Sequence, residues 1–507
     1  MIRGMPTRRT MLRAGIASLS WLAVALALAL AATPARANGR FPAANSIVFS
    51  PADPRTLVGR TTFGILPSSD DGASWRWMCE DALALPSTMV SDPELALSAS
   101  GALIVGVPKP YTLGVSVSGD LGCNWGCVGP LADRQVADVV LRPLSPHAVL
   151  ALASGAAAPD GGLSPPQVFE TTDDGATWAP LGAPLDASDP TLEVLSIDVA
   201  KSDAARIYVS ATRGAGTQRR ASLFVSADDG ASWTERALPA YDGQSEGGVY
   251  IGAVDPTDPG RVYVRSSGAG ALDVSANASC DPGLGRSRLF VTPDAGATWT
   301  VAPLPVSCQI LGFALSDDGS RVYAGTFGEG LFAASRADLK FVKTSPIHVE
   351  CLATRGRELW ACSDAVSGMI FGVSTTEGAC FEPRLLQLTT VAGPIACAPS
   401  PAGPFACQAT TNGAVCTRDA FQNLCVTPYA MDPGCFVDVA PPDAGCEPGD
   451  ASPGDASPGD ASPRRAGFSA RGGSCGCSTP GGPGPAGAAA LAIALAAAAA
   501  MRRRRRA

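Results

Sequence analysis

Short runs of β-branched, aromatic and other apolar residues recur along the middle of the chain, separated by turns rich in Asp, Pro and Gly. IYVSATR at 207–213 and RVYVRSS at 261–267 have the composition and length of β-strands, and so do LFVS at 223–226 and LFVT at 289–292. A turn such as DPTDPGR at 255–261 precedes each pair of strands. The pattern predicts a repeating unit of strand, turn, strand, loop and strand.

The third strand of each unit runs directly into an octapeptide, [Ser/Thr]-x-Asp-x-Gly-x-[Ser/Thr/Asn]-Trp, and a fourth strand is expected after it. Its copies span 68–75, 118–125, 171–178, 226–233 and 292–299. They begin 50, 53, 55 and 66 residues apart, which is room for one four-stranded sheet and a loop. Self-similarity at this period predicts a β-propeller in which each copy marks one blade.

Each position of the octapeptide has an expected structural role. The Asp carboxylate can accept bonds from backbone N–H groups of its own turn, and the first Ser or Thr adds a second side-chain bond. The Gly allows a positive φ, and the Trp packs between neighbouring sheets. We therefore interpret the Asp residues as turn-closing rather than as metal ligands or acids. The residues concerned are Asp70, Gly72, Trp75, Asp120, Gly122, Trp125, Asp173, Gly175, Trp178, Asp228, Gly230, Trp233, Asp294, Gly296 and Trp299.

Three weaker units follow the five clear ones. The segment 311–341 keeps the strands, although its octapeptide has decayed. The segment 350–384 carries STTEGACF, in which Thr376 replaces the Asp and Phe381 the Trp. The segment 395–425 is short and rich in Cys, and is either a blade or a disulfide-tied closing segment. We predict an all-β, single seven-bladed propeller of four-stranded antiparallel blades, with eight blades as the alternative.

The octapeptide resembles the Asp-box, or BNR repeat, shared by sialidases, sortilin-type receptors, some xyloglucan-cleaving glycosidases and many bacterial surface proteins. The resemblance covers roughly 42–425 and implies the same propeller fold. It does not imply catalysis, because the repeat itself is structural.

The charge and the cysteine content of the chain indicate its cellular compartment and the kinds of partner it can bind. The 507 residues carry a formal charge of −8, and ten Arg lie in the first 37 residues and the last six, so the remaining body carries −8 − 10 = −18. An acidic body argues against binding nucleic acid. Sixteen Cys and only two His, His147 and His348, favour disulfides over zinc sites and indicate an oxidising compartment. We predict no cofactor and no metal.

Separation along the chain suggests local disulfides. The candidate pairs are Cys123 with Cys127, Cys280 with Cys308, Cys351 with Cys362, Cys397 with Cys407, Cys416 with Cys425, and Cys435 with Cys446. Free buried thiols are the alternative.

The N-terminal 37 residues have the features of a signal peptide. A basic start precedes an apolar run from Ile16 to Ala32, and cleavage is expected after Ala37. TRRTMLRAG at 7–15 resembles a twin-arginine export signal, with ordinary secretion as the alternative.

The C-terminus predicts a linker and an anchor. Three GDASP copies make 426–471 too poor in apolar residues to form a core. The segment 472–507 has a Cys motif, an apolar run of about 16 residues and an Arg cluster, an order that resembles the MYXO-CTERM sorting signal. The resemblance implies removal of the hydrophobic helix by a sorting protease in the membrane, with Cys475 or Cys477 as the processing or lipid-attachment site. A permanent single-span anchor is the alternative.

These segments predict four parts: a signal peptide (1–37), the propeller (38–425), a disordered linker (426–471) and the sorting signal with its helix and Arg tail (472–507).

A catalytic site is not evident. A sialidase would need three Arg for a substrate carboxylate, a Tyr activated by a Glu, and an Asp acid. The Phe/Tyr-Arg-Ile-Pro motif of sialidases is missing, and spacing selects no three among Arg55, Arg60, Arg206, Arg265 and Arg321. Tyr250 with Glu246 is an unconstrained candidate pair, and a xyloglucanase-like site would need two inward carboxylates.

We therefore expect an exported, monomeric protein that is anchored at the cell surface or outer membrane, or released outside the cell. Its predicted role is binding or scaffolding of a protein or glycan through the most variable loops, 155–167, 213–222 and 267–288. The alternatives are a secreted sialidase-type glycoside hydrolase, which is the enzyme class if it is an enzyme, and a purely structural envelope component.

Overall fold

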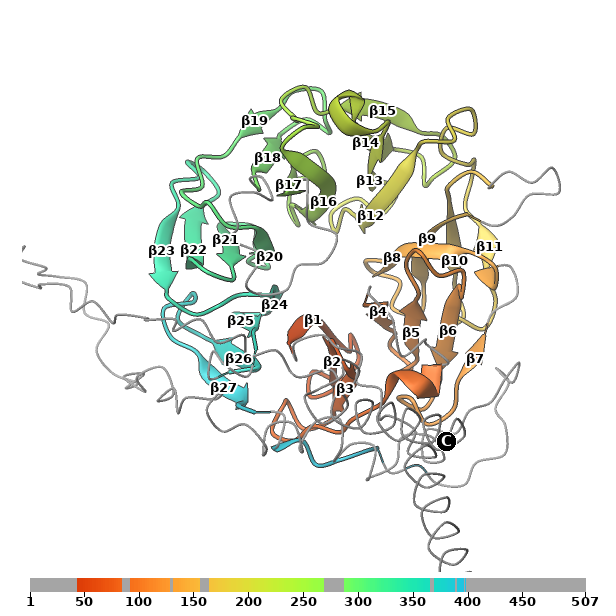
Figure 1. Ribbon diagram of the computed structural model, residues 1–507. Coiled ribbons are helices and arrows are strands. Elements are labelled where there is room, and N and C mark those ends of the chain that lie inside the picture. Colours follow the sequence, from red (N-terminus) through yellow and green to blue (C-terminus); the bar gives the residue numbers. More distant parts are fainter. Residues whose placement is uncertain are drawn as a thin grey trace, which may run out of the picture. The chain divides into compact units, whose positions relative to one another are not determined.

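The computed structural model describes residues 43–83, 92–127, 131–155, 164–268, 287–364, 369–387, 390–395 and 397. They form seven antiparallel sheets arranged as the blades of one ring (Figure 1), so the predicted seven-bladed propeller is confirmed. The predicted signal peptide, linker and sorting signal, with Ala37, Cys475 and Cys477, lie outside the described residues, as does most of 395–425.

The blades follow the chain in order, and in each the first strand is innermost. Blade 1 contains β1 (Ala44–Phe49), β2 (Leu57–Thr61) and β3 (Gly64–Ser68); blade 2 contains β4 (Glu94–Leu97), β5 (Leu103–Gly106), β6 (Val115–Ser118) and β7 (Gly126–Cys127). Blade 3 contains β8 (Gln135–Leu141), β9 (Val149–Ser154), β10 (Gln167–Thr171) and β11 (Ala179–Pro180); blade 4 contains β12 (Glu193–Val199), β13 (Ile207–Arg213), β14 (Arg220–Ser226) and β15 (Thr234–Ala237).

The remaining three blades repeat this arrangement. Blade 5 contains β16 (Glu246–Val254), β17 (Val262–Gly268), β18 (Leu289–Thr292) and β19 (Thr300–Val301); blade 6 contains β20 (Ile310–Leu315), β21 (Arg321–Thr326), β22 (Gly330–Ser335) and β23 (Val342–Ser345). Blade 7 contains β24 (Cys351–Arg355), β25 (Glu358–Cys362), β26 (Phe371–Ser374) and β27 (Glu382–Leu385). Short 3-10 helices lie at Glu80–Leu83 and Gly216–Gln218.

The core lies between neighbouring blades. Ile104 and Val117 of blade 2, for example, share one buried cluster with Val149, Phe169 and Trp178 of blade 3. Both faces of a blade are therefore covered, which explains why its strands read as nearly continuous apolar runs.

The ring closes where blade 7 meets blade 1. Ala43 pairs with Asp364, and the N–H of Ala44 donates to the carbonyl of Ser363 at 3.0 Å. At this junction Gly59 lies against Phe371, and a Cβ at position 59 would lie 2.2 Å from the ring. Only glycine allows the two blades to approach so closely.

Blade 1 has three strands where four were expected, and a C-terminal segment lies against its outer edge. Met78 bridges to Ile65 in the place of a fourth strand. The N–H of Trp77 donates to the carbonyl of Gly393 at 2.8 Å, and the N–H of Ile395 donates to the carbonyl of Trp77 at 3.1 Å. The segment 391–395 is thus a closing segment, hydrogen-bonded parallel to residues 75–77.

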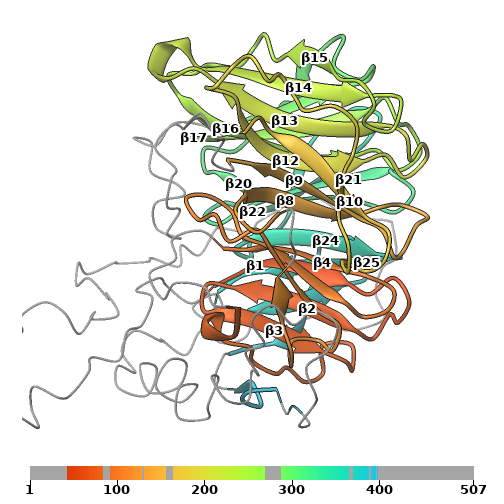
Figure 2. The same cartoon turned by 90° about the vertical axis from the view of Figure 1, so that its right-hand side faces the viewer.

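Because the strands are antiparallel, the connections fall on two faces of the ring, which Figure 2 shows edge-on. Turns between the first and second strands, and octapeptides between the third and fourth, form what we call the octapeptide face. Connections between the second and third strands, and between successive blades, form the loop face. Within this face, the octapeptides are hydrogen-bonded to the turns between first and second strands. The N–H of Asp71 donates to the carbonyl of Arg55, and the N–H of Asp229 donates to the carbonyl of Ala205.

Candidate functional site

The five octapeptides adopt one hydrogen-bonded turn. In the copy at 171–178, the hydroxyl of Thr171 accepts the N–H of Gly175 and donates to Asp173. Asp173 also accepts the N–H and the hydroxyl of Thr177, at 2.8 and 2.7 Å. The same bonds recur around Asp70, Asp228 and Asp294, and around Asp120 the side-chain amide of Asn124 donates in place of the hydroxyl. These Asp carboxylates are engaged within their own turns, which leaves them poorly suited to catalysis.

Two consecutive positions of the turn are left-handed, although sequence reasoning assigned a positive φ only to the Gly. In four copies the Gly has φ between 78° and 90°, and Gly122 has φ 98°. The fourth position also has positive φ, with values of 60–62° at Asp71, Asp174 and Asp229. Asp and Asn tolerate this region better than other non-glycine residues, so the frequent Asp at position four was an available signal.

The tryptophans divide into two groups by their hydrogen bonds. Trp125, Trp178 and Trp299 donate from Nε1 to the glycine carbonyl of their own octapeptide at 3.1 Å. Trp75 donates instead to Arg384 of blade 7, and Trp233 to Ala183 in the connection from blade 3. These two side chains join neighbouring blades directly.

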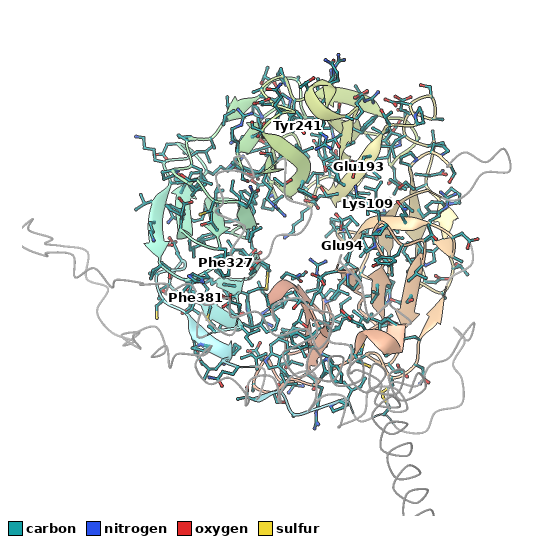
Figure 3. The ribbon with its side chains drawn as sticks, viewed as in Figure 1. Glu94, Lys109, Glu193, Tyr241, Phe327 and Phe381 are labelled. Carbon is teal, nitrogen blue, oxygen red and sulfur yellow. A yellow bond between two sulfur atoms is a disulfide. The ribbon has the colours of Figure 1, made fainter. Side chains whose placement is uncertain are left out.

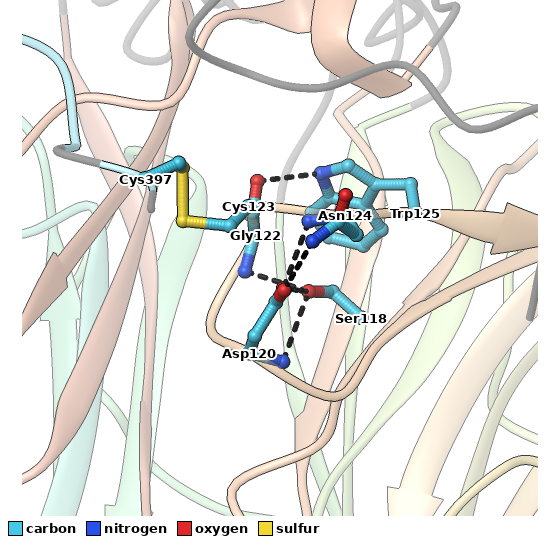
Figure 4. Close-up of a disulfide and its surroundings, with 7 residues drawn as sticks. All are labelled: Ser118, Asp120, Gly122, Cys123, Asn124, Trp125 and Cys397. Atoms are coloured by element: carbon cyan, nitrogen blue, oxygen red, sulfur yellow. Dashed lines mark hydrogen bonds between the residues drawn. A yellow bond between two sulfur atoms is a disulfide. The ribbon is translucent and has the colours of Figure 1, made fainter. Parts of the chain in front are cut away.

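A disulfide ties the closing segment to blade 2. Cys123, the sixth residue of the second octapeptide, is bonded to Cys397, 274 residues later (Figure 4). The expected pairs Cys123–Cys127 and Cys397–Cys407 are therefore wrong, because closure of the ring brings distant segments together. The pair Cys351–Cys362 is confirmed, since these residues face each other in β24 and β25. Cys79, Cys308 and Cys380 are also disulfide-bonded.

The three variable loops arise from consecutive blades. The loop at 155–167 joins β9 to β10, that at 213–222 includes the link from β13 to β14, and that at 267–288 joins β17 to β18. Each connects a second strand to a third strand, so all three leave blades 3, 4 and 5 at the loop face.

Polar side chains surround the centre of the loop face. Lys109, from the β5–β6 loop of blade 2, forms an ion pair with Glu193 at the start of β12 in blade 4. Figure 3 shows Glu94, Lys109 and Glu193 beside the central opening. Burial and the nearby Arg219 lower the pKa of Lys109.

The inner wall of the ring carries further charges. The Arg60 guanidinium lies 2.7 Å from Glu94 and also donates to Asn45 at 2.8 Å. Arg265 lies over the ring of Tyr250, 5.0 Å from its centroid, and donates to the carbonyl of Ile310. Burial lowers the pKa of Arg265 and raises that of Tyr250.

The arginines needed for a sialidase-type site are not brought together. Of the five candidates, Arg60 and Arg265 lie on second strands near the inner wall, whereas Arg55, Arg206 and Arg321 lie at the octapeptide face. Glu246 does not pair with Tyr250: it is buried and forms an ion pair with Arg288.

A carboxylate that sequence reasoning missed lies at the loop-face end of blade 7. Glu350 directly precedes β24 and makes no side-chain hydrogen bond or ion pair to the described residues. Burial, together with the charges of Asp364 and Asp92, raises its pKa to about 8. His348, close by in the chain, packs against Phe327, and burial lowers its pKa. A perturbed carboxyl group of this kind is typical of functional sites.

Glu350→Gln is expected to change the pH dependence of stability. A carboxyl group with a higher pKa in the folded than in the unfolded state costs stability once the pH exceeds its unfolded value, here 4.5, and the cost grows up to about pH 8. The free energy of unfolding of the variant should exceed that of the wild type by about 1–3 kcal/mol at pH 8 and by little at pH 5. This figure is smaller than the full pKa shift would give, because solvent screens part of the electrostatic cost at this site. Urea denaturation at both pH values measures the difference. Parallel pH profiles would contradict the assignment.

The part of the chain that the structure describes contains neither a metal-binding cluster nor a membrane-spanning helix. In those ranges, no three His, Cys, Asp or Glu side chains are grouped so that they could hold a metal ion. Nor does any helix there have the length and apolar character needed to cross a membrane.

Comparisons with known proteins assign neither a family nor a function to the chain. No protein-family model matches the chain, and no curated protein matches it. Among solved structures it is similar to an ancestral GH74 enzyme, at 14% identity and TM-score 0.47, covering 69% of this chain and 47% of that one. It is also similar to a GH74 enzyme of Niastella koreensis, at 15% identity and TM-score 0.29, covering 67% and 71%. The Cps50 (Swd1) β-propeller domain of Myceliophteria thermophila matches at 13% identity and TM-score 0.43, covering 66% and 97%. The chain thus spans about half the length of the first of these proteins.

Proposed function

We propose that this protein is an exported, surface-anchored binding or scaffold protein whose partner, a protein or a glycan, binds the loop face. The observation that carries the proposal is the emergence of the three variable loops from three consecutive blades on one face. Long loops held by a rigid scaffold commonly carry recognition. The opposite face is occupied by octapeptide turns whose side chains are already hydrogen-bonded.

The charges of the loop face support a polar partner. Arg213 at the end of β13 is held by Asp186 and Asp189 at 3.1 Å and by Glu235 at 2.8 Å. Arg220, which begins β14, is exposed and makes no ion pair to the described residues. A fixed arginine beside a free one suits a partner that presents carboxylate, sulfate or amide oxygens.

The test uses the purified full-length chain on a glycan array and in pull-downs from the cell-surface fraction. We expect a retained partner whose binding falls at least tenfold in Arg220→Glu. Arg55→Glu is the matched control, because Arg55 is also exposed but lies at the octapeptide face. Equal loss in both variants, or no partner at all, would refute the proposal.

The surface anchor has a separate test. Replacing Cys475 and Cys477 by serine is expected to move the protein from the cell surface to the medium or the periplasm, which fractionation and surface labelling would detect. An unchanged location would refute the role of these cysteines.

A second candidate is glycoside hydrolysis, and Glu350 is the observation that favours it. A carboxyl group that stays protonated near neutral pH can act as the general acid, and Asp92 or Asp364, whose charges act on it, would supply the second carboxylate. Turnover of fluorogenic glycosides, including a sialoside, that is abolished in Glu350→Gln would support this candidate over simple binding.

A further inference from the structure

The fourth position of the octapeptide joins neighbouring blades through ion pairs. The guanidinium of Arg355 in blade 7 lies 2.5 Å from Asp71 of blade 1, and that of Arg321 in blade 6 lies 2.9 Å from Glu377 of blade 7. Arg142, which follows β8 of blade 3, forms an ion pair with Asp229 of blade 4. At these three junctions, an arginine of one blade meets an acidic residue at position four of the next.

The junction between blades 4 and 5 has the arginine without the acid. Arg206 is the counterpart of Arg321, because each lies at the start of a second strand, two residues before a tyrosine, Tyr208 or Tyr323. Position four of the next octapeptide is Ala295, the counterpart of Glu377. No carboxylate from blade 5 therefore reaches Arg206 through this position.

A cavity of about 210 Å³ lies at this place on the octapeptide face. Its lining includes Arg206, Arg236, Asp228, Ser232, Thr234 and Ala295. Its volume exceeds that of several water molecules, each of which occupies about 30 Å³ in the liquid. A sulfate ion or a carboxylate group can be accommodated in such a space.

The positive charge at the cavity is only weakly paired. Arg206 forms one long ion pair, in which its Nε lies 3.9 Å from Asp203, and this buried Nε makes no hydrogen bond. Arg236 makes no ion pair to any described residue, and its side-chain stem packs against Gly296 of blade 5. Asp228 also lines the cavity, but its oxygens already accept bonds from Ser226 and from the N–H and hydroxyl of Ser232.

We propose that this cavity binds an oxyanion, either a free inorganic anion or the sulfate or carboxylate group of an acidic saccharide. The anion would take the place of the carboxylate that position four supplies at those three junctions, and would bridge Arg206 and Arg236. Guanidinium groups suit this chemistry because their planar N–H groups pair with two oxygens at once. The hydroxyl of Thr234 lies in the same wall and adds a donor. This site is independent of the partner proposed for the loop face.

The deciding variant is Ala295→Asp. Ala295 has φ 54°, close to the 60–62° of the aspartates at position four elsewhere, so the backbone accepts the change without strain. The new carboxylate should pair with Arg206, raise the melting temperature in chloride by about 2 °C, and exclude the anion. Because this variant is expected to be more stable, loss of anion binding could not be attributed to unfolding.

The experiment is calorimetric titration of the full chain with sodium sulfate, sodium glucuronate, a sulfated disaccharide and neutral glucose, at matched ionic strength. We expect the wild type to bind the anions and not glucose, and Ala295→Asp and Arg206→Met to lose at least tenfold in affinity. A sulfated disaccharide that binds more tightly than sulfate identifies a saccharide ligand, and equal affinity identifies a free anion. Absence of anion binding to the wild type, or equal binding to the wild type and Ala295→Asp, overturns the proposal.

Discussion

Replacing both Cys123 and Cys397 by serine is expected to lower the free energy of unfolding by about 5 kcal/mol. This disulfide joins residues 274 positions apart, and the entropy that a cross-link removes from the unfolded chain grows with the length of the closed loop. The bond also fastens the closing segment, so 391–395 should become sensitive to proteolysis in the variant. Urea denaturation and limited proteolysis measure the two effects.

The matched control is the double replacement of Cys351 and Cys362. Their separation is 11 residues, for which the same reasoning gives about 3 kcal/mol. The control should also leave the closing segment resistant to protease. An equal loss of stability in both variants would show that loop length does not determine the effect, and protection of 391–395 in the first variant would show that its hydrogen bonds to 75–77 suffice.

Trp75→Ala is expected to destabilise the protein by about 3–5 kcal/mol, the usual cost of truncating a large buried aromatic residue. Trp75 is 2% exposed, stacks on Phe371 of blade 7 with ring centroids 4.6 Å apart, and donates a hydrogen bond to Arg384. The substitution therefore opens a cavity at the junction where the ring closes. Thermal and urea denaturation measure the loss.

Trp233→Ala provides the comparison, because Trp233 occupies the same octapeptide position in blade 4 but is only partly buried. Its loss should cost clearly less than that of Trp75. Equal effects would mean that the octapeptide turn itself, rather than packing across the closing junction, sets the contribution of the tryptophan.

The blades were predictable from the sequence because the interactions that form their turns and strands join residues close together in the chain. The octapeptide bonds join residues no more than four positions apart, as from Ser68 to Gly72 and from Asp70 to Ser74, and they can form wherever the octapeptide occurs. Strand patterns such as 207–213 likewise depend only on neighbouring residues. The number of such units, including the decayed units at 311–341 and 350–384, predicted seven blades, with eight as the alternative because 395–425 could have been a further unit.

The disulfides show where local reasoning fails. Cys351 and Cys362 were paired correctly, since adjacent strands of one hairpin hold them. Cys123 was assigned to Cys127 because they are close in sequence, yet its partner is Cys397. Sequence separation predicts a bond within a blade and carries no information about the contact between the closing segment and blade 2.

The candidate sites were less predictable than the fold for the same reason. The variable loops could be recognised in the sequence as interruptions of the repeat. That all three lie on one face of the ring follows only from the order of the strands within each blade. The raised pKa of Glu350 depends first on burial, and then on the charges of Asp364 of blade 7 and of Asp92, which precedes blade 2. The cavity beside Ala295 depends on an arginine from the preceding blade.

The sequence alone thus predicted the octapeptide turns, most of the strands and a propeller of seven or eight blades, because hydrogen bonds and side-chain patterns within a few residues specify each of them. Only the tertiary structure decided that Cys123 pairs with Cys397, which carboxylates lie near one another and which arginine faces an octapeptide without an acid at position four. These features depend on contacts between residues far apart in the sequence, which meet only when the blades pack together and the ring closes.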